Sequence, residues 1–484
     1  MSLFSVAPSR RELLTNPHFL GLAGLAWFCL IAYLYPLSNW VGLLPLFPLA
    51  ILSPRSTASV VVMCWLPSSL GGALHPWLGN RLPIPPDDLT QTLRWLLVSW
   101  CLLVAIMRKR QNGEDDYSYI TLIAVYVALL LVLSILTSEF PRTSFSRVMA
   151  WAIAVSAIHV CLQKLSAEDW NWVVKLFITT ILSTTLVSLA VQGLPGARMG
   201  FNALLRGIFA HPQNLGPMIA SLCAYLVCHY LLRQEAKGGL HYTRAAGILL
   251  ACLLALYWTR SRTAALSFVL GIALAVVVHR TVSDALRFHG GKLVATTILC
   301  LIAGTAFVIA DPNVLDSIVN KYNAEESALD LSMQTRLGMY GRQIGVFLNY
   351  PLFGSGFGLP ALAPEDYENA RKTGTLYFST EKGFLLTAVL QEGGLVGFAL
   401  FVGFLLAMLK RMGRNSDPRI LAAAGASLFS NIGEASFFAL GGIGYYHWIW
   451  FTLAMQSATR GRKPLTSGIP PPSPTSVVQA ANPQ

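Results

Sequence analysis

Charged residues are scarce in this chain. Asp, Glu, Lys and Arg make up 12% of its 484 residues, whereas apolar residues make up 54%. The mean hydropathy of +0.55 lies well outside the range of a soluble domain. A soluble globular protein is therefore excluded, and the length leaves room for roughly a dozen membrane spans of about 20 residues each.

Several other patterns are missing as well. No Cys, His and carboxylate cluster has the spacing of a metal site, so we expect no metal and no other cofactor. The eight cysteines all lie within apolar runs, which excludes a disulfide framework in the outer loops. The sequence contains no repeat of about 20–50 residues, so a solenoid is not indicated. The net charge of +12 is dispersed over many loops, which argues against a nucleic-acid partner.

The apolar runs instead predict an all-α polytopic membrane protein with about 12–14 transmembrane helices, in contact with membrane lipid. The first run follows two arginines and lacks a small-residue cleavage site, so it is interpreted as a retained helix. The second and third runs are short and contain proline, so either could be re-entrant. The runs lie near 19–36, 39–53, 57–74, 92–107, 118–137, 146–163, 171–193, 214–232, 244–259, 263–279, 293–310, 383–409, 419–436 and 440–457.

Basic residues recur in every second loop, which predicts the orientation of the chain. We expect residues 1–18 and the Pro-rich, disordered tail 461–484 to lie in the cytoplasm, with a large, partly helical loop at 311–382 on the opposite side. The basic residues assigned to the cytoplasmic side are Arg55, Arg108–Arg110, Lys164, Arg233, Lys237, Arg244, Arg280, Arg287, Lys292, Lys410, Arg411, Arg414, Arg419, Arg460, Arg462 and Lys463.

Four unusual segments then reach the outer face. They are the loop Arg198–Asn214, the turn Arg260–Arg262, the loop 311–382 and the stretch Asn431–Glu434. An outer arginine gains nothing from the positive-inside bias, and near the bilayer it is costly unless it faces a partner, water or an anionic ligand. The outer arginines therefore predict a negatively charged substrate, with headgroup contact, interfacial anchoring or loop ion pairs as alternatives.

Motifs in these segments resemble those of the O-antigen ligase and O-antigen polymerase superfamily. The matching stretches are Arg-Gly-Ile-Phe-Ala-His-Pro-Gln-Asn (206–214), Ser-Arg-Thr-Ala-Ala (261–265), Pro-Leu-Phe-Gly-Ser-Gly-Phe-Gly (351–358) and Leu-Gln-Glu-Gly-Gly-Leu-Val-Gly (390–397). The resemblance covers about residues 200–400. It divides the chain into N-terminal spans at 19–195 and a ligase-like domain at 196–460, which includes the loop 311–382.

The resemblance implies a glycosyltransferase of the bacterial inner membrane, acting in lipopolysaccharide or exopolysaccharide assembly. Such enzymes move a glycan from undecaprenyl diphosphate to a hydroxyl acceptor at the periplasmic face. A ligase uses lipid A–core as the acceptor, whereas a polymerase uses another lipid-linked repeat. The ligases carry a His-Asn pair where this chain has Ser-Thr-Glu-Lys (379–382), and this difference leaves both activities open.

Candidate residues follow from this chemistry. An arginine fork suits phosphate oxygens, so Arg206, Arg260, Arg262 and Arg336 are predicted to bind the diphosphate without a metal. An acceptor hydroxyl needs a nearby base, for which Glu381 is the first candidate and Glu434 the rival. His211, Asn214 and Glu392 are supporting candidates, although a structural cap at His211 and a helix contact at Glu392 are alternatives.

Two other classes of function compete with this hypothesis. Many spans with polar residues also describe a secondary transporter, but transporters tend to show paired repeats. The N-terminal half has no second copy of the Arg206 or Arg262 segment. A noncatalytic assembly protein would leave the outer arginines unexplained.

Overall fold

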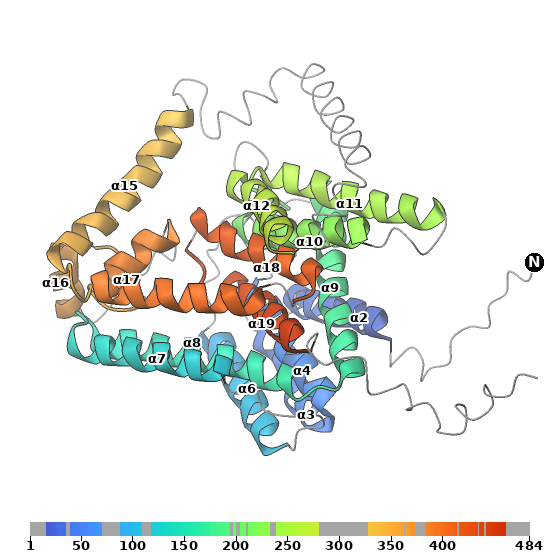
Figure 1. The fold of residues 1–484 in the computed structure, drawn as a ribbon, viewed down its shortest axis with the longest axis horizontal. Coiled ribbons are helices and arrows are strands. Elements are labelled where there is room, and N and C mark those ends of the chain that lie inside the picture. Colours follow the sequence, from blue (N-terminus) through green and yellow to red (C-terminus); the bar gives the residue numbers. More distant parts are fainter. Residues whose placement is uncertain are drawn as a thin grey trace, which may run out of the picture.

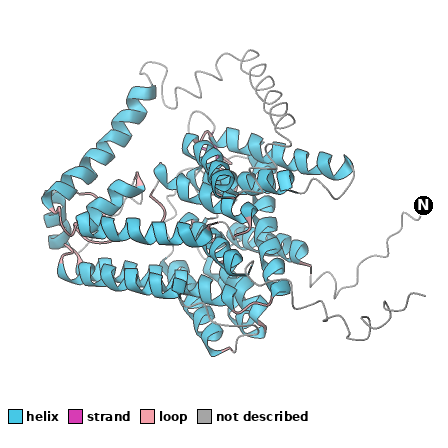
Figure 2. Ribbon diagram, in the orientation of Figure 1, coloured by secondary structure: helices cyan, strands magenta, loops and turns pink. Residues whose placement is uncertain are grey.

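The computed structural model describes residues 16–34, 39–69, 88–108, 118–193, 197–199, 204–209, 212–232, 239–279, 328–362, 364–373, 383–413, 416–433, 435–439 and 442–460. In this part of the chain nearly every element is a helix, and the only sheet is one short antiparallel pair (Figure 2). The prediction of an all-α membrane protein is confirmed.

The elements follow one another as a series of helices packed side by side (Figure 1). The N-terminal half contains α2 (Pro17–Leu34), η1 (Asn39–Leu43), α3 (Leu46–Leu52), α4 (Pro54–Met63), α5 (Leu66–Ser69), α6 (Asp88–Met107), α7 (Ser118–Leu136), α8 (Pro141–Gln163), α9 (Ala167–Ala190) and η4 (Val191–Gly193). The C-terminal half contains β1 (Arg198–Met199), β2 (Leu204–Leu205), α10 (Pro212–Leu232), α11 (Gly239–Thr259), α12 (Arg262–Val278), α15 (Ala328–Asn349), α16 (Pro364–Thr373), α17 (Leu385–Met412), α18 (Pro418–Phe429), η5 (Ser430–Ile432) and α19 (Ile443–Arg460).

Among the described helices, four are long and apolar enough to cross a membrane: α8, α9 with η4, α10 and α17. Six shorter apolar helices accompany them in the same part of the chain. The second and third predicted spans each consist of short helices. Ser53, which has extended backbone, separates α3 from α4. The span predicted near 293–310 and the tail 461–484 lie outside the described residues.

Helix boundaries follow local signals in the sequence. Ser53 and Ser56 form a capping box at the start of α4, and Ser166 accepts a hydrogen bond from Asp169 N at the start of α9. Asp417 caps α18, where proline at the first helical position presets the backbone. These signals explain why the observed starts lie close to the expected ones.

Helices α10, α12 and α18 pack with their backbones close together. A Cβ on Gly271 of α12 would lie 2.5 Å from both Ala422 O and Ala426 N of α18. Ser221 Oγ of α10 and Ser427 Oγ of α18 lie 2.8 Å apart in the same interface. Small residues at such contacts allow the close approach on which helix association in membranes depends. This three-helix unit holds the turn that precedes α12 and the segment that follows α18, both of which are predicted to lie at the outer face.

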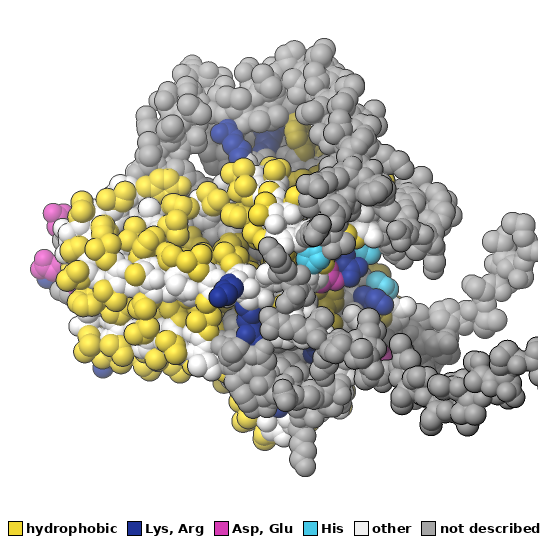
Figure 3. All heavy atoms as spheres, in the orientation of Figure 1, with side chains coloured by type: hydrophobic (Ala, Val, Ile, Leu, Met, Phe, Trp, Pro, Cys, Tyr) yellow, Lys and Arg dark blue, Asp and Glu magenta, His cyan; other side chains and the backbone are white. Residues whose placement is uncertain are grey.

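A second core forms around α19, which is buried along most of its length. Trp448 of α19 packs edge-on against Trp151 of α8 at 5.3 Å and against Phe437 at 4.7 Å between ring centroids. Aromatic pairs in these geometries add to the energy of burial. Towards the outside, Figure 3 shows hydrophobic side chains spread over the surface of α7 and α17. Leu136 of α7 and Leu406 of α17 are exposed, as expected for helices in contact with lipid.

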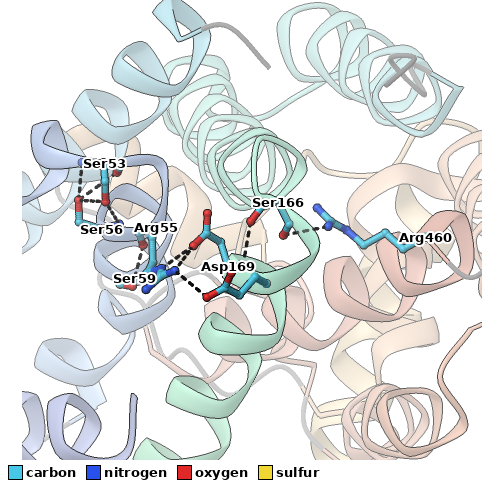
Figure 4. A network of polar contacts seen from close by, with 8 residues as sticks. Ser53, Arg55, Ser56, Ser59, Ser166, Asp169 and Arg460 are labelled. Atoms are coloured by element: carbon cyan, nitrogen blue, oxygen red, sulfur yellow. Dashed lines mark hydrogen bonds and ion pairs between the residues drawn. The ribbon is translucent and has the colours of Figure 1, made fainter. Parts of the chain in front are cut away.

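One end of the bundle gathers basic residues that the sequence assigns to a common side. Arg55 Nε donates to Asp169 Oδ1 at 2.5 Å, and Arg108 Nη1 donates to Thr57 Oγ1 at 2.7 Å. Arg460 Nη1 donates to Ser166 O at 3.3 Å, close to Asp169 (Figure 4). The contacts join four segments predicted to be cytoplasmic, those that contain Arg55, Arg108, Lys164 and Arg460. Their meeting at one end agrees with the predicted alternation of basic loops.

Candidate functional site

At the opposite end, Arg206 lies on a turn held by its own backbone. Strands β1 and β2 pair with Arg198 opposite Leu205, and Arg206 N and Gly207 N then both donate to Ala197 O at 3.0 Å. The backbone at Gly207 has φ +60°, and a Cβ there would lie 2.2 Å from Ser188 Oγ of α9. Glycine is therefore required beside Arg206, and the turn is fixed against α9.

Arg206 is half-buried on this turn. Burial lowers the pKa of its guanidinium below the usual value, but an arginine remains charged at neutral pH. A cation that has already lost part of its water interacts more strongly with an anion than an exposed one does.

The second arginine segment is the tight turn between α11 and α12. Arg260 N donates to Tyr257 O at 3.0 Å, and Arg260 takes φ +50°, the one positive φ at a non-glycine residue in the described part of the chain. Ser261 then caps α12 by accepting a hydrogen bond from Ala264 N at 3.4 Å. Arg260 is half-buried and Arg262 is exposed. The left-handed backbone conformation is unfavourable in free energy for an arginine, and it persists only where the surrounding structure imposes it. Such strained residues are common at functional sites.

The packing brings three of the four predicted segments together. A Cβ on Gly216 of α10, two residues after half-buried Asn214, would lie 2.8 Å from Ser261 Cβ. A Cβ on Gly433, in the fourth segment, would lie 2.0 Å from Thr263 Cγ2. Strand β2, which directly precedes Arg206, packs against α11, the helix that leads into the Arg260–Arg262 turn. Figure 3 shows Lys and Arg side chains at this end of the molecule, above α12.

The fourth segment is shaped by polar contacts. Asn431 Nδ2 donates to Ser427 O at 2.9 Å, and Asn431 Oδ1 accepts from Ser436 Oγ at 3.2 Å. Ser430 Oγ lies 3.3 Å from Nε2 of the fully buried His447. These bonds fold the chain after α18 back towards Thr263. Asn431 begins one of the four segments predicted from the sequence, whereas Ser436 and His447 were not predicted to be part of the site.

The third segment docks elsewhere, on α17. Its turn-rich part, Pro351–Gly358, lies against Glu392. Phe357 of this part packs against Phe438, four residues beyond the fourth segment, with ring centroids 5.1 Å apart. Glu392 is buried and accepts a hydrogen bond from Gly358 N at 2.9 Å. Glu392 therefore contacts the docked loop.

The remaining candidates are less fully placed. Arg336 lies in α15, but only its backbone is described, and Glu381, Glu434 and His211 lie outside the described residues. Arg147 of α8, which contacts Gly358, is a polar residue of this region that the sequence analysis missed. Its position near the outer end of an apolar span was the available signal. In the described part of the chain, no group of three His, Cys, Asp or Glu residues could hold a metal ion.

Residues 247–402 match the family model described as O-antigen ligase. This part of the chain is similar to an O-antigen ligase domain. The match begins in α11 and ends within α17, so it contains the Arg260–Arg262 turn and Glu392. The resemblance read from the motifs is therefore confirmed for the superfamily. No curated protein matches the chain.

Arg206 and Asn214 precede the residues that match the O-antigen ligase model, but the elements beside them pack onto the matched part. Gly216 of α10 lies against Ser261, and β2 lies against α11. This packing joins the predicted site residues across the boundary of the match.

Proposed function

We propose that this O-antigen ligase-like protein is an inner-membrane glycosyltransferase. It moves a glycan from undecaprenyl diphosphate to a hydroxyl acceptor at the periplasmic face. The observation that carries the proposal is the convergence of the Arg206 turn, the Arg260–Arg262 turn and the start of α10 at one end of the bundle.

The chemistry assigns the arginines to the leaving group. During transfer the acceptor oxygen forms a bond to the anomeric carbon of the glycan, and the bond from that carbon to the diphosphate oxygen breaks. The lipid diphosphate departs, and the negative charge on it grows in the transition state. Arginine binds phosphate oxygens through two parallel N–H donors and stays charged in a partly dry site. Arg206, Arg260 and Arg262 supply such donors from adjacent turns, and Arg336 of α15 adds a fourth. Arginines placed in this way stabilise the departing diphosphate without a metal ion.

The acceptor hydroxyl needs a proton acceptor on the same face. Glu381 precedes α17 directly, and Lys382 beside it favours the ionised carboxylate. Glu434 follows Gly433, which packs against Thr263 of the arginine turn. We assign the role to Glu381, with Glu434 as the rival.

Transfer by purified variants tests the arginine assignment. Arg262→Lys keeps the charge but loses the fork, and we expect transfer to fall about 10²- to 10³-fold while the protein stays folded and inserted. Arg206→Lys should behave alike. Arg342→Lys, at an exposed position on α15, is the matched control and should transfer normally. Wild-type rates in both the Arg206 and the Arg262 variants would exclude the proposed site.

The same assay separates the two candidate bases. Removing a general base typically slows a reaction about 10²- to 10⁴-fold, so Glu381→Gln should bind donor normally and transfer slowly. An unimpaired Glu381→Gln enzyme together with a slow Glu434→Gln enzyme would move the role to Glu434.

Ligation and polymerisation of repeat units are both compatible with the domain. Gel analysis of surface polysaccharide from a deletion strain distinguishes them. Loss of all capped lipid A–core indicates a ligase with lipid A–core as acceptor, whereas core bearing a single repeat indicates a polymerase. An unchanged polysaccharide profile would contradict both activities.

A further inference from the structure

Helix α17 is broken in the middle. Gly394 has φ +60° and ψ −161°, which ends the helical hydrogen-bond ladder at that point. Leu395 N donates instead to Pro351 O at 2.9 Å, and Val396 N donates to Leu352 O at 3.1 Å. Figure 1 shows the resulting bend in α17, at the corner where the end of α15 meets it.

The carbonyl groups before the break are satisfied by the same loop. Ser355 N donates to Gln391 O at 2.9 Å, and Gly356 N donates to Glu392 O at 3.1 Å. Residues 350–359, which we call the wedge loop, thus pair with both sides of the break. Non-helical backbone at membrane depth is tolerated where protein groups satisfy it.

The fit between wedge loop and helix leaves no room for side chains. A Cβ on Gly354 would lie 2.4 Å from the carbonyl carbon of Glu392, and a Cβ on Gly394 would lie 2.4 Å from the carbonyl carbon of Leu352. Both glycines also have positive φ. The loop and the break are therefore complementary in shape as well as in hydrogen bonding.

Two charged side chains fasten the end of the wedge loop. Glu392 Oε2 accepts from Gly358 N at 2.9 Å, and Arg147 Nη1 of α8 donates to Gly358 O. A Cβ on Gly358 would lie 2.5 Å from Arg147 Cδ. Arg147 and Glu392 also attract each other electrostatically. Gly358 is thus held between a carboxylate and a guanidinium from two different helices.

The surroundings make this arrangement costly to break. Glu392 is 6% exposed, and it lines a small cavity together with Tyr126, Phe357 and Phe438. A buried charge that loses its partner is strongly destabilising, because no water replaces the lost contact. Removing the charge of one partner should therefore release the loop.

The wedge loop directly continues α15. Thr387 Oγ1 at the start of α17 donates to Gln343 Oε1 of α15 at 2.5 Å, and the rings of Tyr340 and Phe384 pack edge-on at 6.5 Å. The direction of α15 thus depends on the first half of α17, whose own direction is set by the filled break.

We propose that Glu392 and Arg147 are positioning residues that hold the wedge loop in the break of α17 and thereby fix α15 for glycan transfer. Neither touches the reacting groups. Their action on transfer rests on the proposed function, because α15 carries Arg336, whereas their action on the direction of α15 does not.

Distances between spin labels test the structural step without any substrate. Labels are placed at Arg342 on α15 and at Leu406 in the second half of α17, both exposed, in a chain whose native cysteines are replaced. A narrow distance distribution is expected for the parent. Glu392→Gln and Arg147→Met should broaden or shift it. Glu368→Gln, which removes one partner of an exposed ion pair on α16, is the matched control and should leave it unchanged. Unchanged distributions in both clamp variants would overturn the proposal.

Kinetics of the unlabelled variants test the consequence. Misplacement by about 1 Å can cost about 10²-fold in rate, so Glu392→Gln and Arg147→Met should lower kcat by about 10- to 100-fold. The KM for the lipid-linked donor should change less, and the fraction of folded protein should stay near that of the parent. Arg147→Lys keeps a charged donor and should retain more of kcat than Arg147→Met.

The outcomes are distinguishable. A kcat that falls only as far as the folded fraction falls, or displaced labels with a normal kcat, would overturn the positioning role. A wild-type protein that transfers no glycan would refute the proposed function, while the label distances would still test whether Glu392 and Arg147 hold the wedge loop.

Discussion

Gly271 in α12 and Gly394 in α17 both allow backbones to touch, but in different ways. At Gly271 the helix is continuous, and the missing side chain lets α12 lie directly on Ala422 and Ala426 of α18. At Gly394 the helix is broken by a positive φ, and the wedge loop fills the break. The first contact joins two helices, whereas the second joins a helix to a loop.

The two contacts support different parts of the candidate site. The α12–α18 contact holds α12, the helix that begins at Arg262. It therefore fixes the Arg260–Arg262 turn relative to α10 and α18. The filled break in α17 orients α15, a helix of the large loop 311–382 that is predicted to lie on the outer side. A defect at Gly271 should therefore threaten the whole fold, whereas a defect at Gly394 should act on the outer segment.

The largest effect is expected for Gly271→Val. Its Cβ would lie 2.5 Å from backbone atoms of α18, which cannot move aside as a flexible side chain can. Overpacking typically costs about 1–3 kcal/mol, and contact with backbone places this variant at or beyond the upper end. Thermal unfolding of the purified protein in detergent measures the loss. Gly403→Val in α17, where nothing lies within 4 Å of the added Cβ, is the control. Equal stability of the two variants would remove the first half of the comparison.

A smaller effect on stability is expected for Gly394→Ala. An alanine in this backbone conformation is strained by about 1–3 kcal/mol, and its Cβ would strike Leu352. We expect a folded, inserted protein whose α15 labels are displaced and whose transfer is slow. Gly393→Ala, where the nearest atom to the added Cβ is 4.0 Å away, should leave label distances and transfer intact. If Gly393→Ala and Gly394→Ala behaved alike, the break would not be the feature that matters.

The positions of the helices could be predicted from the sequence because apolar runs and helix caps are local signals. The span predicted at 263–279 corresponds to α12 (Arg262–Val278), and its start is marked by Ser261. The grouping of Arg206 with Arg262 was also accessible, since the alternation of basic loops places both on one side.

The rest required packing that no local pattern contains. The break at Gly394 lies in an apolar run that predicts one continuous span, because neighbouring Gly393 and Gly394 do not reveal which residue takes positive φ. The role of Arg147 depends on Gly358, a residue 211 positions away in the sequence. Glu392 was identified as an intramembrane carboxylate, but its partner loop was not.

The central claim is that Arg206 and Arg262 share one diphosphate. Binding of undecaprenyl diphosphate to the purified protein in lipid nanodiscs tests it most directly. We expect Arg206→Lys and Arg262→Lys each to weaken binding about 10- to 100-fold, the change that about 1.4–2.8 kcal/mol produces. The double variant should lose less than the product of the two, because both side chains contact one ligand. Arg342→Lys should bind as the wild type does. Wild-type affinity in the Arg206 and Arg262 variants, or fully independent losses, would contradict the claim.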